Sequence, residues 1–177
     1  MKLINKKVRI AKAEFNGQHH LEFDALLEFN ERGFPEDIIF ITLVEDQQFN
    51  ENKKHYMQVK SNDIRAVIEA AKDLLQNGEK AEPFEKHTRK NGALKTFTLG
   101  TSMKERRSEG KEPKSYPVYF INIIEKRVKY GMGMDRHYFG AFIERLEFLV
   151  QKLEGSLYDA QKHISFQGAV QNSKKEH

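Results

Sequence analysis

Cysteine is absent from all 177 residues of the sequence. This absence excludes disulfide bonds, thiolate metal sites and a cysteine nucleophile, and it favours the reducing cytoplasm as the compartment. No apolar run approaches the roughly 20 residues that a membrane-spanning helix needs, so we expect no membrane partner. The first eight residues include lysines but no apolar stretch follows them, and we therefore expect no signal peptide.

Recognisable catalytic motifs are also lacking. The sequence contains no nucleophile elbow, no Walker motif and no pair of histidines one helical turn apart. Gly131-Met132-Gly133 precedes a predicted helix, but the third glycine of a dinucleotide-binding turn is missing. His19-His20 has no further ligands at the spacing of a metal site. We therefore expect no enzyme activity, no cofactor and no bound metal.

The formal net charge is small, and its distribution is more informative than its size. The chain has 30 lysines and arginines and 26 acids, which gives +4. Between Thr101 and Tyr130 eight bases outnumber four acids, so this stretch carries an excess of 8 − 4 = +4. The bases are Lys104, Arg106, Arg107, Lys111, Lys114, Lys126, Arg127 and Lys129.

Three features recur in the same order in both halves of the chain. An Asn-Gly pair occurs at 16–17 and again at 91–92, and a strand-like apolar block at 38–45 has its counterpart at 118–125. A short alternating stretch then leads into an amphipathic helix in each half. The differences in spacing fall in loops, as expected for a duplicated fold. The sequence therefore predicts a first unit over 1–78, a second over 79–155 packed with the first, and a partly disordered tail over 156–177.

Each unit is predicted to contain four β-strands followed by a helix. The Asn-Gly pairs suit tight hairpin turns, and Ser61 or Asn62, and later Asp135, suit helix N-caps. Asn77-Gly78 and Gly155 are the expected helix ends. The expected strands are 7–15, 21–29, 38–44 and 55–60, then 83–88, 93–101, 118–124 and 128–134, with a charged loop over 102–115.

The predicted fold class is α+β, with two tandem ββββα units that form a pseudo-dimer. A four-stranded meander with one helix cannot cover both faces of its sheet, and packing of the two units against each other solves this problem. The central strands each offer a mostly apolar face for the helix side. The matching residues on these faces are Ile39, Ile41 and Leu43 in the first unit and Tyr119, Ile121 and Ile123 in the second.

This plan resembles the PUR repeat, the PC4-type coactivators and the Whirly proteins over residues 1–155. The strand-to-helix junctions carry the resemblance: Tyr56-Met57-Gln58-Val59-Lys60-Ser61 leads into Ile64, Val67 and Ile68, and Gly131-Met132-Gly133-Met134-Asp135 leads into Phe139, Phe142 and Ile143. The resemblance implies that single-stranded DNA or RNA binds on a curved outer sheet. The acidic second strand of the first unit, with Glu22, Asp24 and Glu28, departs from a strongly basic sheet.

Basic and aromatic residues are interleaved in the second unit, as single-strand binding requires cations for phosphates and aromatic faces for bases. We expect residues 104–114 and the turn at 126–129 to hold the backbone, and Phe97 or Phe120 to stack on bases. Alternatively, these aromatic residues belong to the core and the loop is only solvated. The predicted interface is Lys95, Phe97, Lys104, Arg106, Arg107, Lys111, Phe120, Lys126, Arg127 and Lys129.

Two functional hypotheses follow from the sequence. The first is a single-stranded nucleic-acid-binding protein, with DNA favoured, that acts by electrostatic capture and base stacking with little sequence specificity. The alternative is a protein-interaction or inhibitor module, such as one from a phage or mobile element, which the near balance of charges and the acidic strand favour. Exposed sheet edges are compatible with a homodimer under either hypothesis.

Overall fold

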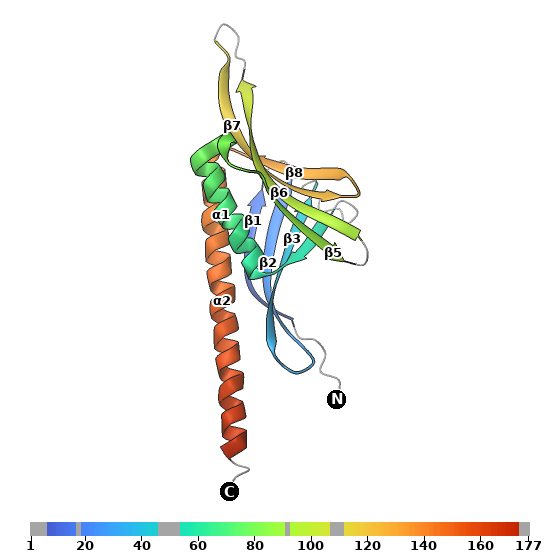
Figure 1. Ribbon diagram of the computed structural model, residues 1–177, viewed down its shortest axis with the longest axis vertical. Helices are drawn as coiled ribbons and strands as arrows, with labels where there is room; N and C mark the ends of the chain where they lie inside the picture. The colour runs from blue at the N-terminus through green and yellow to red at the C-terminus, as the bar shows by residue number, and fades with distance from the viewer. Residues whose placement is uncertain (1–6, 17–18, 46–53, 91–92, 107–111, 174–177) are drawn as a thin grey trace.

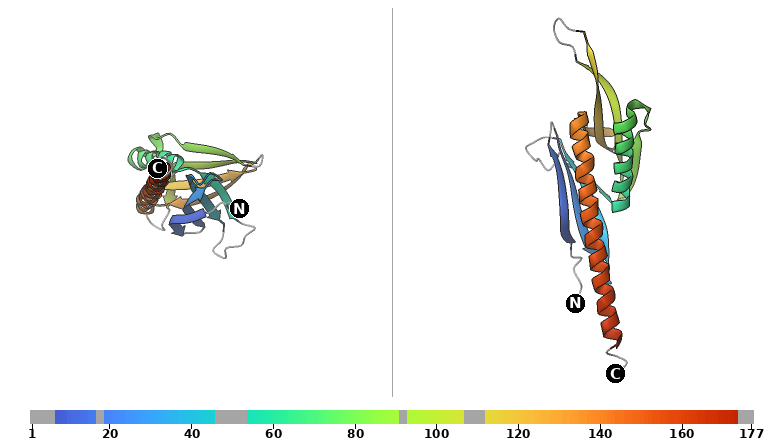
Figure 2. Two further views of the ribbon diagram at one scale, coloured as in Figure 1. Left: turned by 90° about the horizontal axis from the view of Figure 1, so that it is seen from below. Right: turned by 90° about the vertical axis from the view of Figure 1, so that its left-hand side faces the viewer.

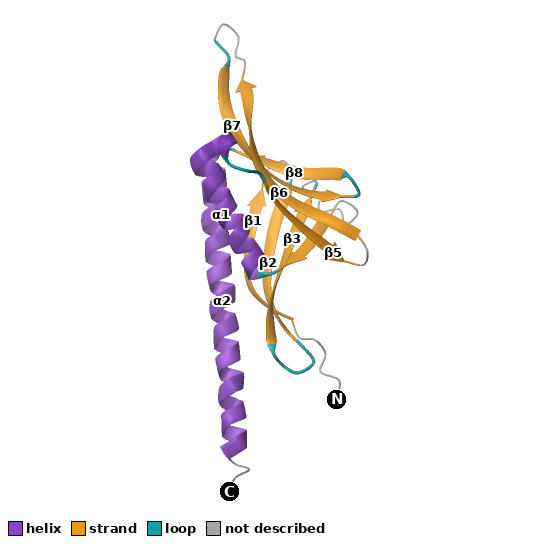
Figure 3. Cartoon of the chain, in the orientation of Figure 1, coloured by secondary structure: helices purple, strands orange, loops and turns teal. Residues whose placement is uncertain are grey.

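The computed structural model describes residues 7–16, 19–45, 54–90, 93–106 and 112–173 (Figure 1). It contains two antiparallel four-stranded meanders, each followed by a helix, which confirms the α+β class and the tandem ββββα order (Figure 3). The N-terminal sheet consists of β1 (Lys7–Asn16), β2 (His20–Phe29), β3 (Pro35–Val44) and β4 (Lys54–Val59). The C-terminal sheet consists of β5 (Phe84–Lys90), β6 (Ala93–Arg106), β7 (Lys114–Glu125) and β8 (Val128–Met134). The helices are α1 (Ser61–Asn77), with a 3-10 turn η2 (Gly78–Lys80) after it, and α2 (Arg136–Ser173).

Alternation along the strands decides which side chains enter the core. In β2, Leu21, Phe23 and Ala25 are buried, because every second residue of a strand points to the same face. The central strands β3 and β7 repeat this pattern around Ile41 and Ile121. The apolar faces predicted for the two central strands are therefore confirmed.

Each helix packs on the sheet of the other half of the chain. α2 contacts β1, β2 and β3, whereas α1 contacts β5 and β6 as well as β3. The ring of Phe142 in α2 lies 5.0 Å from that of Phe15 and 5.8 Å from that of Phe23, measured between centroids. Phe23 in turn lies 6.4 Å from Phe97 of β6. Figure 2 shows the two helices side by side, and the buried residues of both halves form one core.

The helix ends follow local hydrogen bonding. At α1 the expected caps Ser61 and Asn62 are wrong: Lys60 is the N-cap residue, and its N–H donates to the Asp63 carboxylate over 3.0 Å. The predicted end is confirmed, since α1 stops at Asn77 and Gly78 follows with φ of 60°. Asp135 caps α2 as predicted, because its carboxylate accepts the N–H of Tyr138 over 2.8 Å.

The second helix is longer than the sequence predicts. Its expected end at Gly155 is wrong, because α2 continues to Ser173. One glycine within a helix costs only about 1 kcal/mol relative to alanine, and Leu157 and Ala160 beyond it still pack against the core. The tail predicted from 156 is thus helical to Ser173, and residues 174–177 lie outside the described residues. Neither α2 nor any other described helix combines the length and apolar content needed to cross a membrane.

The charged loop predicted over 102–115 is also wrong. β6 extends to Arg106 and β7 begins at Lys114, and these two residues lie opposite each other in the ladder. β-Branched and aromatic residues such as Thr101, Tyr116 and Val118 favour this strand pairing over a loop. Residues 107–111 lie outside the described residues.

Replacement of Phe142 by alanine tests the shared core. We expect Phe142→Ala to lower the free energy of unfolding by about 3–5 kcal/mol, as for other buried aromatic residues. The matched control is Phe148→Ala on the same helix, where the side chain is 58% exposed; this change should cost less than about 1 kcal/mol. Urea denaturation followed by far-UV circular dichroism and by tyrosine fluorescence provides the measurement. Both probes should show one transition, and two separate transitions would contradict a core shared by both halves.

Candidate nucleic-acid interface

The outer face of the C-terminal sheet is the face turned away from the core. Because Phe97, Leu99, Tyr119 and Ile121 are buried, their neighbours along β6 and β7 point outwards. The strand register then defines the members of this outer face. They are Glu85, His87 and Arg89 in β5, Thr96, Thr98, Gly100, Ser102, Lys104 and Arg106 in β6, Lys114, Tyr116, Val118, Phe120, Asn122 and Ile124 in β7, and Lys129, Gly131 and Gly133 in β8.

A half-buried aromatic ring lies at the centre of the outer face. Phe120 is opposite Gly100 on one side and Gly133 on the other. A Cβ atom at Gly100 would lie only 2.3 Å from Cζ of the Phe120 ring, so the ring extends across the Gly100 backbone. The Lys129 ammonium lies 4.8 Å from the ring centroid, within the range of a cation–π contact. Glycine at position 100 thus allows the ring to lie along the sheet, where one π-face can meet a ligand.

In the next row of the outer face, around Asn122, the side chains also lie close to the sheet. The Asn122 amide donates to the hydroxyl of Thr98 over 3.0 Å. Its oxygen lies 1.9 Å from the position that a Cβ at Gly131 would take, so the amide rests on the glycine backbone. Both rows therefore combine a side chain of β7 with glycine on a neighbouring strand, which keeps the surface flat.

A groove of about 270 Å³ adjoins this surface where β8 ends. Lys104, Tyr116 and Val118 line one wall, and the backbone around Gly131 and Gly133 lines another. His19 and residues 132, 134 and 135 complete the lining. The Tyr116 side chain is 41% exposed, so the groove offers a second aromatic surface beside Phe120.

The cations of the outer face lack an ion-pair partner among the residues that the structure describes, and the same holds for the two cations of the turn between β7 and β8. On β6, β7 and β8 these cations are Lys104, Arg106, Lys114 and Lys129, and in the turn they are Lys126 and Arg127.

The outer face of the N-terminal sheet has the opposite character. Arg9 pairs with Asp24 over 2.6 Å, and the Lys12 ammonium pairs with Glu22 over 2.9 Å and with Glu14. The hydrogen bond between Lys12 and Glu14 raises the pKa of Lys12 and lowers the pKa of Glu14. The acidic second strand noted in the sequence is thus neutralised by cations of β1, which leaves little charge to attract a phosphate.

The two cations of the β7–β8 turn occupy an unfavourable backbone conformation. Lys126 and Arg127 have φ of 50° and 68°, and they connect the paired residues Glu125 and Val128. A two-residue hairpin of this kind requires positive φ at both positions, which favours Asn-Gly. A side chain in the left-handed region costs roughly 1–2 kcal/mol per residue. Such strain at an exposed turn indicates a functional role for its side chains.

Two residues of the predicted interface lie elsewhere. Phe97 is only 1% exposed and belongs to the core, so its predicted role in base stacking is wrong. Lys95 points inwards: its ammonium donates to the Tyr56 carbonyl over 2.8 Å and lies 3.3 Å from the Glu125 carboxylate. Its predicted contact with nucleic acid is therefore also wrong, since these contacts tie β6 to β4. Arg107 and Lys111 lie outside the described residues.

Sequence reasoning missed two contributors to this surface. Lys114 belongs to the segment 104–114 that is expected to hold the backbone, but Tyr116 and Gly100 are not among the predicted interface residues. Gly100 lies inside a predicted strand, and a glycine in that position signals close approach of another group. That signal could have identified Gly100 as the position that the Phe120 ring covers.

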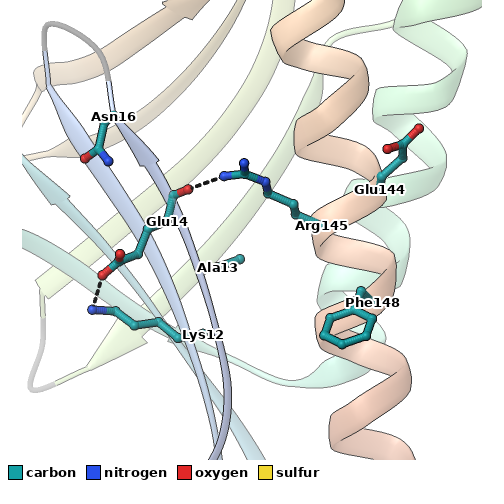
Figure 4. A pocket seen from close by; sticks show the side chains of 7 residues that line it. All are labelled: Lys12, Ala13, Glu14, Asn16, Glu144, Arg145 and Phe148. Atoms are coloured by element: carbon teal, nitrogen blue, oxygen red, sulfur yellow. Dashed lines mark hydrogen bonds and ion pairs between the residues drawn. The ribbon is translucent and has the colours of Figure 1, made fainter.

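Two further clusters on the N-terminal sheet do not provide an anion or metal site. The cavity between β1 and α2 measures about 550 Å³. In it the Lys12 ammonium pairs with the Glu14 carboxylate, and the Arg145 guanidinium donates to the Glu14 backbone carbonyl, as Figure 4 shows. Ligand atoms of Glu14, His20 and Glu22 lie within 4.8 Å of one another. The Lys12 ammonium already contacts both carboxylates, so a metal ion would have to displace it.

Relief of the strained turn should stabilise the protein. We expect Lys126→Asn combined with Arg127→Gly to raise the free energy of unfolding by about 1–2 kcal/mol, because both residues tolerate positive φ. Urea denaturation measures the change. The control Lys126→Gln with Arg127→Gln removes the same charges without relieving the backbone, and an equal gain in that variant would contradict the explanation by strain.

Comparison with known proteins does not assign the chain to a family. A scan against models of protein families finds none that matches, and a search of curated proteins finds no relative. The functional assignment therefore depends on the charges and shape of the outer face.

Proposed function

We propose that the protein binds single-stranded nucleic acid, with DNA favoured, along the outer face of the C-terminal sheet in the manner of a Whirly/PUR-like domain. The observation that carries this proposal is the flat surface around Phe120 with unpaired cations at both of its ends. Phosphates need cations that are free to pair, and bases need an accessible aromatic face. The outer face provides both within one sheet.

The dimensions of this face suit an extended strand. From Lys114 to Ile124, β7 advances by ten residues, which corresponds to about 34 Å at the rise of a β-strand. Lys104, Arg106 and Lys114 lie at one end, and Lys129 lies at the other beside the turn. A single strand that runs along β7 would thus place phosphates over both ends and bases over Phe120 and Tyr116.

Stacking and charge also account for weak sequence discrimination. Every base has a π-face, so stacking on Phe120 tolerates all four bases. Phosphate contacts carry no sequence information. If each of the unpaired cations releases one counterion, the logarithm of the affinity should fall with the logarithm of the salt concentration with a slope of about −4. The cytoplasmic compartment predicted from the absence of cysteine belongs to this same proposal.

A second candidate, a protein-interaction module, is favoured by one observation. Phe148 is exposed beside the cavity between β1 and α2, whose lining contains two bases and two acids and so carries no net charge (Figure 4). A partner bound there would gain little from long-range electrostatics. Its affinity would therefore change little with salt, in contrast to that of a nucleic acid.

Substitutions around Phe120 test the proposed interface. We expect Phe120→Ala to weaken binding of a fluorescently labelled single-stranded oligodeoxynucleotide by about 1–3 kcal/mol, the usual contribution of one stacked base. Gly100→Ala should also weaken binding, because the added methyl group forces the Phe120 ring to move. The matched controls are Phe148→Ala, an exposed aromatic on α2, and Gly140→Ala, where a Cβ meets nothing within 4 Å.

The measurement is fluorescence anisotropy at low and at physiological salt, with RNA of the same length in parallel. Binding that falls steeply with salt and is weakened in the Phe120 and Gly100 variants supports the proposal. Absence of binding to either strand at low salt, or equal loss in the two control variants, would refute it and make a protein partner the next ligand to seek.

A further inference from the structure

The hairpin of β6 and β7 projects well beyond the rest of its sheet (Figure 1). β5 begins opposite Leu99, and β8 ends opposite Tyr119. Beyond those points five rungs contain only two strands, from Ser102 opposite Val118 to Arg106 opposite Lys114. We call residues 102–106 and 114–118 the ribbon. Its five rungs correspond to a length of about 17 Å.

The two faces of the ribbon differ in charge. The face continuous with the outer face of the sheet presents Lys104, Arg106, Lys114 and Tyr116 and no acid. The opposite face presents Met103, Glu105, Ser115 and Pro117 and no base. This asymmetry is specific to the ribbon and marks one face for contact with a polyanion.

Packing within the molecule does not explain the ribbon. A two-stranded hairpin is only marginally stable in water without a further layer. Two described residues outside the ribbon form a side-chain hydrogen bond with it. The Glu79 carboxylate accepts the Met103 N–H over 3.1 Å, and the Thr101 hydroxyl donates to the Val118 carbonyl over 3.2 Å. The residues of its cationic face are exposed, and the described residues provide them with no counter-charge. A polyanionic ligand would supply the counter-charge that the described residues do not provide.

We propose that the ribbon enters the major groove of a DNA duplex that adjoins the bound single strand, so that the preferred substrate is a junction of single-stranded and double-stranded DNA. This inference rests on the proposed function of the outer face. The major groove of B-DNA is about 12 Å wide and admits a two-stranded β-ribbon. The deep and narrow major groove of an A-form RNA helix excludes one.

The order of these features along β7 matches the order of the double-stranded and single-stranded parts of such a substrate. Phe120 lies on the wide part of the sheet, and Lys114 lies six residues away at the end of the described ribbon, at a distance of about 20 Å. The groove lined by Lys104 and Tyr116 lies between them, at the corner where the sheet narrows to the ribbon. The last unpaired nucleotide would thus leave the duplex at Tyr116 and continue towards Phe120.

The test compares four labelled ligands with the full-length protein: a single strand, a blunt DNA duplex, a DNA duplex with a single-stranded overhang, and an RNA duplex with the same overhang. We expect the DNA junction to bind about tenfold more tightly than the single strand or the blunt duplex, since the ribbon adds phosphate contacts. The RNA junction should bind no better than its single strand.

Variants separate the two parts of the site. Arg106→Gln with Lys114→Gln should remove the preference for the DNA junction. Because both residues also lie at one end of the single-strand site, binding of the single strand should weaken as well, by about three- to tenfold. An unchanged far-UV circular dichroism spectrum shows that the variant is folded. The matched control is Lys152→Gln with Lys162→Gln, which removes the same charge from exposed positions of α2 and should keep the preference.

Three outcomes would overturn the inference while leaving single-strand binding intact. These are equal affinity for the DNA junction and the single strand, an equal preference for the RNA junction, and a preference that survives in the ribbon variant. Loss of all binding in the wild-type protein at low salt would instead refute the proposed function itself.

Discussion

The structure depends on one packing constraint, which is that each sheet needs the helix of the other half, as well as its own, to cover its apolar face. Phe15 and Phe23 of the N-terminal sheet are covered by Phe142 from the last helix of the chain. α1 lies against β5 and β6 of the other sheet. Since each half supplies the cover of the other, burial of aromatic and aliphatic surface stabilises both halves at once. The inner face of each sheet is therefore committed to the core, and only the outer faces can differ.

The two outer faces differ in whether their charged side chains pair with each other. On the N-terminal sheet, acids of β2 stand opposite bases of β1 and neutralise them, as Arg9 and Asp24 show. On the C-terminal sheet the corresponding surface has glycine and small polar residues around Phe120, with cations beyond them. Surface ion pairs contribute little to stability, so this divergence changes what each face can attract with little effect on the fold. Two ββββα units thus carry different surfaces on the same kind of framework.

The sequence predicts most of the framework because its signals are local. Alternating apolar residues predict the strands, and a 3.6-residue period from Phe139 to Leu153 predicts the buried side of α2. The exchange of helices between sheets could not be predicted, since it depends on contacts such as Phe15 with Phe142 that are distant in sequence. The continuation of α2 past Gly155 was missed for a related reason, because the contact of Leu157 with the core outweighs the local preference of glycine.

The candidate site was predicted less well, because the charge and type of a residue do not reveal the face on which it lies. Lys95 and Phe97 share a strand with Gly100, yet they point to the inner face of the sheet. The assignment of 102–115 as a loop removed the alternation that would have placed Tyr116 and Lys104 on one side. The covalent link from α1 through η2 to β5 has a further consequence. A comparable assembly of two separate subunits would dissociate on dilution, whereas here each half meets its partner at a fixed effective concentration. The folded state and the surface that it displays are thus independent of how much protein is present.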